Sequence, residues 1–362
     1  MLQAELADGS KIALFRLTKQ EISQLKQQES FYCPECKDEV IIKAGEKVIP
    51  HFAHQTKTAC CHSGEGAYHE NGKMDLFEWF RNQKIPVMLE VYLKEIKQRP
   101  DLLVKLGSKT IAIEYQCATI STKEMIKRSN QYRAINIIPI WILGGNRIKR
   151  ISNNQLRISK LDATYIHQFH ENFPHTLYYY CSKQKLFLLY RDIHYLSASN
   201  VIANMTIYPL QEATWKELFT VKQLNKGQLV KAWKYELSNW RNRPVPFHNR
   251  VETAFRQWLY LNHFSVHTLP YYTHLPIANQ MYFKLPPWVW QSRLYIQLIV
   301  KKKKFTLNEA EHLLRTHLIN PSEFPLLSFY NHPIAEYFQL LERIGILRSN
   351  GQNMYEVIRV TV

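Results

Sequence analysis

The chain has 362 residues, which at roughly 100–200 residues per domain corresponds to two or three domains. Hydrophobic residues make up 46% of it, and 11 glycines and 16 prolines are too few for a disordered, collagen-like or low-complexity chain. Lysine and arginine total 47 against 30 acidic residues, a formal net charge of +17. So large a positive charge favours a polyanionic partner, either nucleic acid or an anionic membrane surface.

The membrane alternative finds little support in the sequence. The first residues are polar and hold no apolar stretch of the kind that a signal peptide requires. The longest apolar run, residues 135–143, contains Asn136 and Pro139 and falls far short of the roughly 20 residues that span a bilayer. We therefore expect a cytoplasmic protein with no membrane contact.

A small β module is expected over residues 1–64. The turn Asp8-Gly9-Ser10 predicts a hairpin, and Thr18 with Glu21 predicts the capped start of a helix over residues 18–28. Four of the chain's six cysteines lie in this region. In a chain with no export signal, clustered cysteines indicate a metal site rather than disulfides.

Candidate zinc ligands follow in two pairs. Cys33-x2-Cys36 is separated by fourteen residues from His51-x2-His54, so two thiolates and two imidazoles can close the tetrahedral shell of a structural zinc ion. Cys60 is an alternative fourth ligand if only one of the two histidines binds. The competing interpretations, a redox pair or unrelated cysteines and histidines, account less well for the paired spacing.

Residues 67–83 carry the pattern of an amphipathic helix with an unusual inner stripe. His69 and Lys73 lie on the same face as two large apolar residues, and Glu65 lies one turn earlier on that stripe. Polar side chains on a buried face require partners. The stripe therefore belongs either to a functional site or to a helix whose first turns project into water.

Three strands, a helix and a fourth strand follow. Their predicted ranges are residues 87–93, a strand that begins at Asp101, residues 110–117, residues 121–134 and residues 136–143. Alternation along the third strand places Glu114 and Gln116 on one side, and the hairpin brings Asp101 close to Glu114. Two converging carboxylates favour Mg²⁺ or Mn²⁺, ions that polarise a phosphate and lower the pKa of a bound water.

This α-β-β-β-α-β arrangement resembles the PD-(D/E)XK nuclease core of restriction endonucleases. The motif stands here as Pro100-Asp101, twelve intervening residues and Glu114-Tyr115-Gln116. The resemblance implies that Asp101, Glu114 and the backbone carbonyl of Tyr115 bind the catalytic metal. Gln116 replaces the usual lysine, and a glutamine can only hydrogen-bond where a lysine also carries charge. Lys73 is the candidate to supply the missing cation.

The combination of motifs resembles the competence protein CoiA family. The matching residues are Cys33, Cys36, His51, His54, Glu65, His69, Lys73, Asp101, Glu114, Tyr115, Gln116, Arg128, Tyr132 and Trp141. The resemblance implies a protein made during genetic competence that acts on incoming single-stranded DNA or on recombination intermediates. It also implies the recombinase and its loader as partners.

Residues 151–362 are basic and rich in aromatic residues, and helical patterns near 250–262, 307–318 and 333–345 predict a mainly helical domain. Lys234, Arg241 and Arg243, with Arg128 of the nuclease-like region, are candidates for contacts with DNA phosphates. The interleaved tryptophans can stack on bases, or they can form a core beneath a solvated basic face.

We therefore expect a multidomain α+β and α/β chain: a zinc-finger-like module (1–64), a nuclease-like αβββαβ domain (65–150) and a helical domain (151–362). The expected activity is that of a divalent-metal-dependent DNA nuclease in natural transformation and recombination. Besides the metal-binding residues, Gln116 and Lys73 would position water, His69 would move a proton or contact phosphate, and Glu65 belongs to the same stripe. The alternatives are a DNA-binding accessory on an inactive nuclease core, favoured by Gln116, and a zinc-ribbon transcription factor, which leaves Asp101 and Glu114 unexplained.

Overall fold

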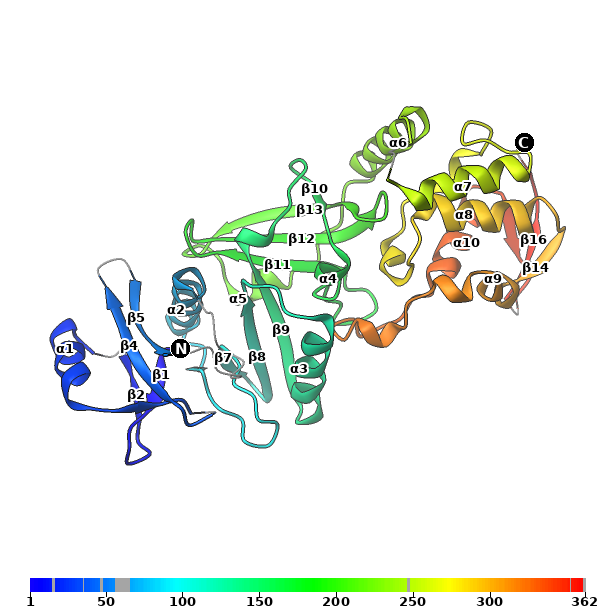
Figure 1. Cartoon of the computed structure of the whole chain (residues 1–362). Coiled ribbons are helices and arrows are strands. Elements are labelled where there is room, and N and C mark those ends of the chain that lie inside the picture. The colour runs from blue at the N-terminus through cyan, green and yellow to red at the C-terminus, as the bar shows by residue number, and fades with distance from the viewer. Residues whose placement is uncertain are drawn as a thin grey trace. The chain divides into compact units, whose positions relative to one another are not determined.

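The structure is a computed structural model that describes residues 1–14, 17–34, 36–45, 48–55, 66–245, 248–351 and 353–360 (Figure 1). The α-helices are α1 Lys19–Gln28, α2 Ala67–Asn82, α3 Thr122–Ala134, α4 Lys160–Ala163, α5 Trp215–Leu218, α6 Lys226–Asn242, α7 Arg250–Leu261, α8 Pro287–Leu294, α9 Leu307–Leu314 and α10 Pro333–Arg343. The strands are β1 Gln3–Glu5, β2 Lys11–Ala13, β3 Phe31–Tyr32, β4 Glu39–Gly45, β5 Val48–His54, β6 Val87–Leu89, β7 Leu102–Leu106, β8 Lys109–Gln116, β9 Ile137–Gly144, β10 Gln155–Arg157, β11 Thr176–Cys181, β12 Leu186–Tyr195, β13 Asn200–Pro209, β14 Lys304–Thr306, β15 Leu347–Ser349 and β16 Met354–Val357.

The chain divides into two compact units. The first comprises Met1–Ile148, Leu177–Leu189 and Thr206–Thr220, and the second comprises Lys149–Thr176, Tyr190–Met205 and Val221–Val362. Among the described residues, no helix combines the length and the apolar character that crossing a bilayer requires.

The first unit begins with the N-terminal module, residues 1–55. Its five strands form a sheet in the order β2-β1-β3-β4-β5. The predicted hairpin is confirmed: β1 and β2 pair antiparallel, and Gly9 takes the positive φ of 81° that its turn needs. The predicted helix is also confirmed, because Thr18 and Glu21 form a reciprocal capping box at the start of α1.

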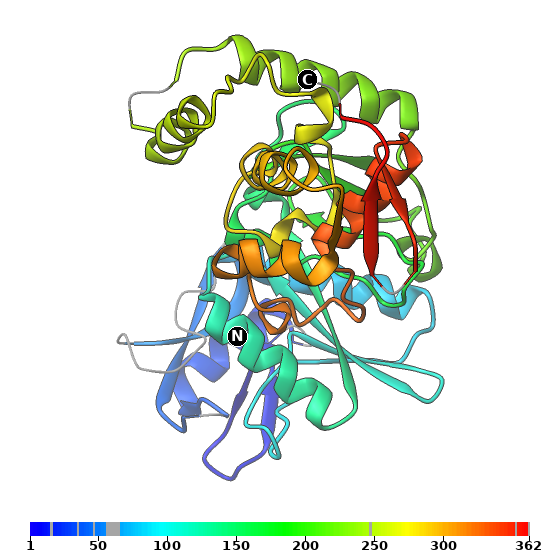
Figure 2. The same ribbon diagram turned by 90° about the vertical axis from the view of Figure 1, so that its right-hand side faces the viewer.

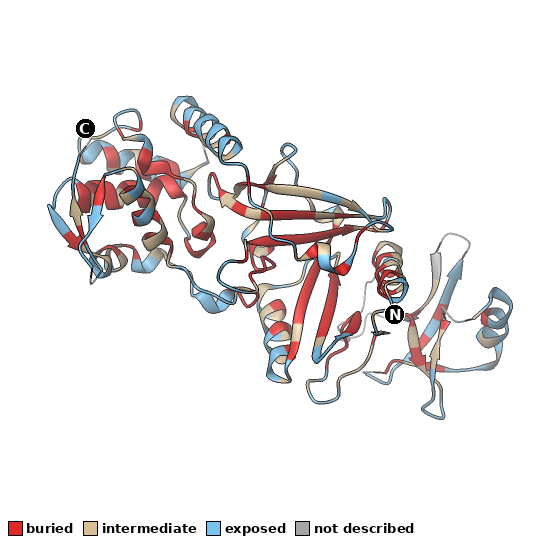
Figure 3. Ribbon diagram, turned by 180° about the vertical axis from the view of Figure 1, so that it is seen from behind, coloured by how far each residue is buried: buried red, intermediate tan, exposed pale blue. Residues whose placement is uncertain are grey.

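The element order predicted for the nuclease-like region is confirmed as α2-β6-β7-β8-α3-β9. Strands β6, β7 and β8 pair antiparallel, and β9 runs parallel to β8. Side chains alternate along β8, so Tyr115 faces α2 whereas Glu114 faces Arg128 and Tyr132 of α3. The two helices therefore cover opposite faces of a sheet whose strands β8 and β9 are mostly buried (Figures 1 and 3).

The sheet continues beyond residue 150, the boundary expected from the sequence. Its strand order is β10-β13-β12-β11-β9-β8-β7-β6, with β6 at one edge. The region expected to be mainly helical therefore starts with four strands. Tyr178, Tyr179 and Tyr180 of β11 are all buried, so both faces of this strand are covered and its sequence lacks the alternation that marks a half-exposed strand.

The later part of the second unit is largely helical, as expected. Helices α7, α9 and α10 match the three predicted helical patterns, and Thr306 with Glu309 caps α9. Strands β14, β16 and β15 form a small antiparallel sheet, and β15 and β16, in red, lie beside α10 in Figure 2. The core of this region contains Trp240, Trp288 and Trp290, so for these tryptophans the core interpretation holds.

Gly72 of α2 provides a test of how this helix meets the sheet. A Cβ at Gly72 would overlap the ring of Tyr115 and lie 2.9 Å from its hydroxyl oxygen. We expect Gly72→Ala to lower the free energy of unfolding by about 1–3 kcal/mol, the usual cost of overpacking, although alanine favours helices. Thermal or urea unfolding would measure the change.

Gly45→Ala is the control, because a Cβ there meets no atom of the described residues within 4 Å. Equal stability of the Gly72 and Gly45 variants would contradict the close approach of α2 to β8.

Candidate functional site

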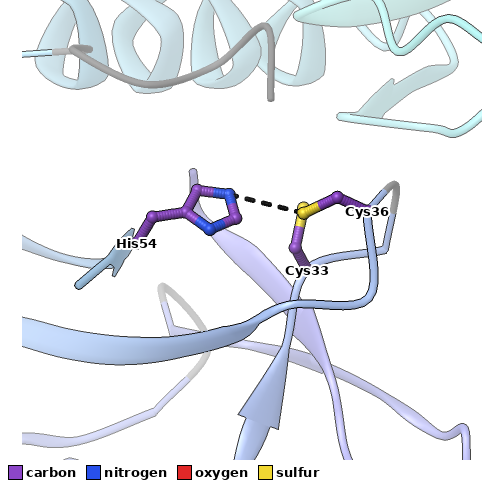
Figure 4. Close-up of side chains that lie close together, drawn as sticks. All are labelled: Cys33, Cys36 and His54. Carbon is purple, nitrogen blue, oxygen red and sulfur yellow. Dashed lines mark hydrogen bonds between the residues drawn. The ribbon is translucent and has the colours of Figure 1, made fainter. Parts of the chain in front are cut away.

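Three of the predicted zinc ligands lie together in the N-terminal module. Cys33 directly follows β3, Cys36 lies in the turn after it, and His54 is the last residue of β5. Their ligand atoms all lie within 4.8 Å of one another, with 3.9 Å between the Sγ of Cys36 and the Nε2 of His54 (Figure 4). Two thiolates and an imidazole are the donors of structural zinc sites, so this set fits zinc with a fourth ligand still to be added.

His51 does not join this group. It lies three residues before His54 on the same strand, and side chains three positions apart in a strand point to opposite faces. In the register of β4 and β5, His51 pairs with Lys43 and His54 with Val40. The expectation that both histidines bind one ion is therefore not met, and Cys60, the alternative fourth ligand, lies outside the described residues.

In the nuclease-like domain, Lys73 is surrounded by carboxylates. Its Nζ lies 2.5 Å from Oε1 of Glu90, 3.2 Å from Oε2 of Glu70 and 3.8 Å from Oδ1 of Asp101. The Lys73 side chain is 1% exposed. A buried ammonium must be paired, and the three carboxylates supply that pairing. We call these four residues the carboxylate–lysine cluster.

Asp101 also connects the cluster to β8 and to His69. Its Oδ2 accepts the backbone N–H of Tyr115 at 2.8 Å and lies 3.3 Å from Nε2 of His69. The imidazole stacks on the Tyr115 ring, with 5.6 Å between ring centroids and 9° between planes. The predicted inner stripe of α2 therefore faces the interior: His69 and Lys73 are buried and have polar partners. Glu65, the third polar residue of the predicted stripe, lies outside the described residues.

Glu70 and Glu90 were not among the predicted site residues. Glu70 is fully buried and lies 3.1 Å from the amino nitrogen of Met1. Glu90 directly follows the edge strand β6, and its Oε2 accepts the backbone N–H groups of Leu2 and Gln3 at 2.9 and 3.2 Å. The sequence signal available for Glu90 was an acidic residue within the predicted strand 87–93, which neighbours the strand that begins at Asp101.

Glu114 lies in a second network on the α3 side of the sheet. Its Oε1 accepts hydrogen bonds from Nη2 of Arg128 and from the hydroxyl of Tyr132, each at 2.5 Å. Burial and the Glu114 carboxylate raise the pKa of Tyr132 well above its ordinary value. Burial, the largest single influence, lowers the pKa of Arg128, but Glu114, Tyr132 and Asp101 together outweigh it and the net pKa rises. Both partners therefore remain protonated donors to Glu114.

The strand register places the backbones of the two predicted metal-binding acids close together. Leu102 pairs with Ile113, so Asp101 lies one position further along, beside Glu114. Carboxylate oxygens are hard donors that suit Mg²⁺ or Mn²⁺. Here the contacts of these oxygens include His69, the Tyr115 amide, Arg128 and Tyr132. The carboxylate oxygens of Asp101 and Glu114 therefore suit a divalent ion, which would have to displace some of these contacts.

Two other predicted groups have local contacts. The Gln116 side chain donates to the carbonyl oxygen of Ala118 at 2.9 Å. Among the expected DNA-binding cations, Arg241 donates to the carbonyl of Leu269, Arg243 pairs with Glu252, and Arg128 pairs with Glu114. Lys234 of α6 is exposed. Across the described ranges, Cys33, Cys36 and His54 form the one group of three or more His, Cys, Asp or Glu ligand atoms within 4.8 Å of one another.

Comparison with known proteins finds three domains of one family along the chain. Residues 14–63 match the competence protein CoiA N-terminal domain, residues 65–223 its nuclease-like domain and residues 229–361 its C-terminal domain. The competence protein CoiA of Bacillus subtilis (strain 168) is 27% identical over 354 residues, which cover 94% of this chain and 93% of that protein. No solved structure matches the chain. This chain therefore belongs to the competence protein CoiA family and carries the three domains of that family in order.

Proposed function

We propose that this chain acts in genetic competence as a divalent-metal-dependent DNA nuclease of the PD-(D/E)XK type. The observation that carries the proposal is the α2-β6-β7-β8-α3-β9 core, with Asp101 directly before β7 and one register position from Glu114 of β8. Asp101, Glu114 and the carbonyl of Tyr115 would hold Mg²⁺ or Mn²⁺. Such an ion polarises the scissile phosphate and acidifies a bound water.

The remaining residues would orient the two metal-binding carboxylates and hold a proton close to them. Arg128 and Tyr132 fix the Glu114 carboxylate from one side, and the Tyr115 amide fixes Asp101 from the other. His69, bonded to Asp101 and stacked on Tyr115, is placed to hold a proton at Nε2. Lys73 would supply the positive charge that Gln116 lacks.

A second candidate is a DNA-binding accessory factor built on an inactive nuclease core. The surroundings of Lys73 favour this candidate, because three carboxylates already neutralise the charge of the lysine. Gln116 favours it too, because its amide is turned toward the carbonyl of Ala118. In either case the proposed partners are single-stranded DNA or recombination intermediates, together with the recombinase and its loader, and the net charge of +17 suits such a polyanion.

Cleavage assays with Mg²⁺ or Mn²⁺ on single-stranded, double-stranded and branched DNA separate the two candidates. We expect Glu114→Ala to reduce cleavage on the order of 100-fold or more, because a metal-bound carboxylate contributes several kcal/mol to the transition state. Glu114→Gln keeps an acceptor for Tyr132 and serves as a better-folded second variant. DNA binding should remain in both.

Glu78→Ala is the control, since Glu78 is a half-buried residue of α2 whose side chain pairs with Arg81. Unchanged cleavage in both Glu114 variants would refute the metal site. Absence of cleavage by the unaltered protein, with tight salt-sensitive DNA binding, would favour the accessory factor.

For the N-terminal module we propose a zinc ion bound by Cys33, Cys36 and His54, with Cys60 as the candidate fourth ligand. Metal analysis of purified variants should show about one zinc per chain for the unaltered protein, and much less for Cys36→Ser and His54→Ala. The melting temperature should fall with the zinc content, because structural zinc binding supplies folding free energy.

His51→Ala is the matched control, because His51 points to the other face of β5 and should keep the metal. Equal loss of zinc from the His51 and His54 variants would contradict the assignment.

DNA contacts by α6 can be tested through salt dependence. We expect Lys234→Ala to reduce the slope of log affinity against log salt by about 0.9 per lost phosphate contact on duplex DNA, or about 0.7 on single strands, with stability unchanged. Arg243→Ala, in contrast, should lower stability, because Arg243 pairs with the buried Glu252. A slope unaffected by the Lys234 substitution would remove this residue from the DNA interface.

A further inference from the structure

We propose that the N-terminal module is an integral part of the candidate nuclease site. Through the backbone amides of Leu2 and Gln3 it holds Glu90, and Glu90 positions Lys73, so that zinc binding in the module organises the carboxylate–lysine cluster. The inference deepens the proposed function and rests on it for the effect on DNA cleavage. The structural coupling itself does not require that the protein cleave DNA.

The first step of the coupling runs from the zinc ligands to Met1. Phe52 lies two residues before His54 on β5, and its backbone N–H donates to the carbonyl of Met1 at 2.8 Å. The Phe52 ring packs against Phe31, with 5.1 Å between centroids, and Phe31 lies two residues before Cys33. An ion that joins Cys33 to His54 therefore fixes the two strands that hold the start of the chain.

The second step runs from the start of the chain to Glu90. Leu2 is fully buried, and its amide and that of Gln3 both donate to Oε2 of Glu90. The Gln3 side chain donates to the carbonyl of Leu89 at 3.1 Å, so the same segment also binds the end of β6. Hydrogen bonds to an ionised acceptor are about twice as strong as neutral ones, and two of them here orient a single carboxylate.

The third step runs from Glu90 to the predicted catalytic residues. Glu90 has a φ of +49°, a left-handed conformation that non-glycine residues adopt only when surrounding contacts enforce it. Its N–H donates to the carbonyl of Asp101 at 3.0 Å. Its Oε1 lies 2.5 Å from Nζ of Lys73. Glu90 is thus a positioning residue: its Oε2 accepts the two N-terminal amides, and its Oε1 pairs with Lys73.

Amide hydrogen exchange of the unaltered protein, with Zn²⁺ bound and after chelation, tests the coupling without any substitution. We expect removal of Zn²⁺ to speed exchange at Leu2 and Gln3 by at least about tenfold, while the β8 amide of Ile113 keeps its protection. Unchanged exchange at Leu2 and Gln3 would overturn the proposal. Equal loss of protection at Ile113 would also overturn it, because zinc would then support the whole unit rather than this connection.

Zinc affinity gives an independent test, since coupling between two sites is reciprocal. If Zn²⁺ strengthens the hold on Glu90, then Glu90→Ala should weaken Zn²⁺ binding, by about tenfold. Glu90→Gln keeps an acceptor oxygen for the two amides and should bind Zn²⁺ nearly as the unaltered protein does. Glu78→Ala is the matched control. Equal Zn²⁺ affinity for Glu90→Ala and Glu78→Ala would overturn the proposal, and if Glu90→Ala fails to fold, the exchange experiment decides.

DNA cleavage, measured in parallel, separates this proposal from the proposed function. If the unaltered protein cleaves DNA, we expect chelation of Zn²⁺ and Glu90→Gln to lower kcat by at least about tenfold with little change in KM, because both disturb Lys73 rather than DNA binding. An unchanged kcat in both cases would overturn the inference. If no variant and no form of the protein cleaves DNA, the nuclease proposal fails and the exchange and zinc measurements alone judge the coupling.

Discussion

The nuclease-like domain is organised around a single buried ammonium group. Removing the charge of Lys73 from water is costly unless anions surround it, and the anions come from three places: Glu70 of α2, Glu90 after β6 and Asp101 before β7. The requirement to pair one charge therefore ties a helix and two strands together. It also requires α2 to lie directly on β8, which is possible because Gly72 leaves room for the ring of Tyr115.

The same pairing bears on both proposed functions of this core, the nuclease and the DNA-binding accessory factor. A lysine paired with three carboxylates stabilises the site, but it offers less charge to a phosphate. On the other face of the sheet, Glu114 is held by Arg128 and Tyr132. A divalent ion that joined Asp101 and Glu114 would have to compete with both networks, so the proposed nuclease activity would depend on how readily these hydrogen bonds are exchanged for metal–oxygen contacts.

Local patterns in the sequence were sufficient for much of the fold. The period of α2, the capping pairs at Thr18 and Thr306 and the β7–β8 hairpin each involve residues close together in the chain, so their chemistry can be recognised without a structure. Strand β11 escaped recognition because burial on both faces removes the alternating pattern.

Two features of the candidate sites depended on contacts that no local pattern contains. Glu90 acquires its role from Leu2 and Gln3, nearly ninety positions earlier in the chain, which only the folded sheet brings near. The pair His51 and His54 has the spacing of two ligands, but its placement on a strand directs the imidazoles to opposite faces. Spacing alone therefore brought Cys33, Cys36 and His54 to attention as candidate ligands, but it also included His51, which lies outside their group.

The edge strand β6 carries a consequence for solubility. An exposed sheet edge presents unpaired backbone groups that can recruit a strand from another molecule. Here β6 has only three residues, and it ends in the left-handed turn at Glu90. The Gln3 side chain donates a hydrogen bond to the carbonyl of Leu89. The Gln3 side chain of the N-terminal module thus covers the Leu89 carbonyl, an acceptor that a separately produced nuclease-like domain would expose at this edge.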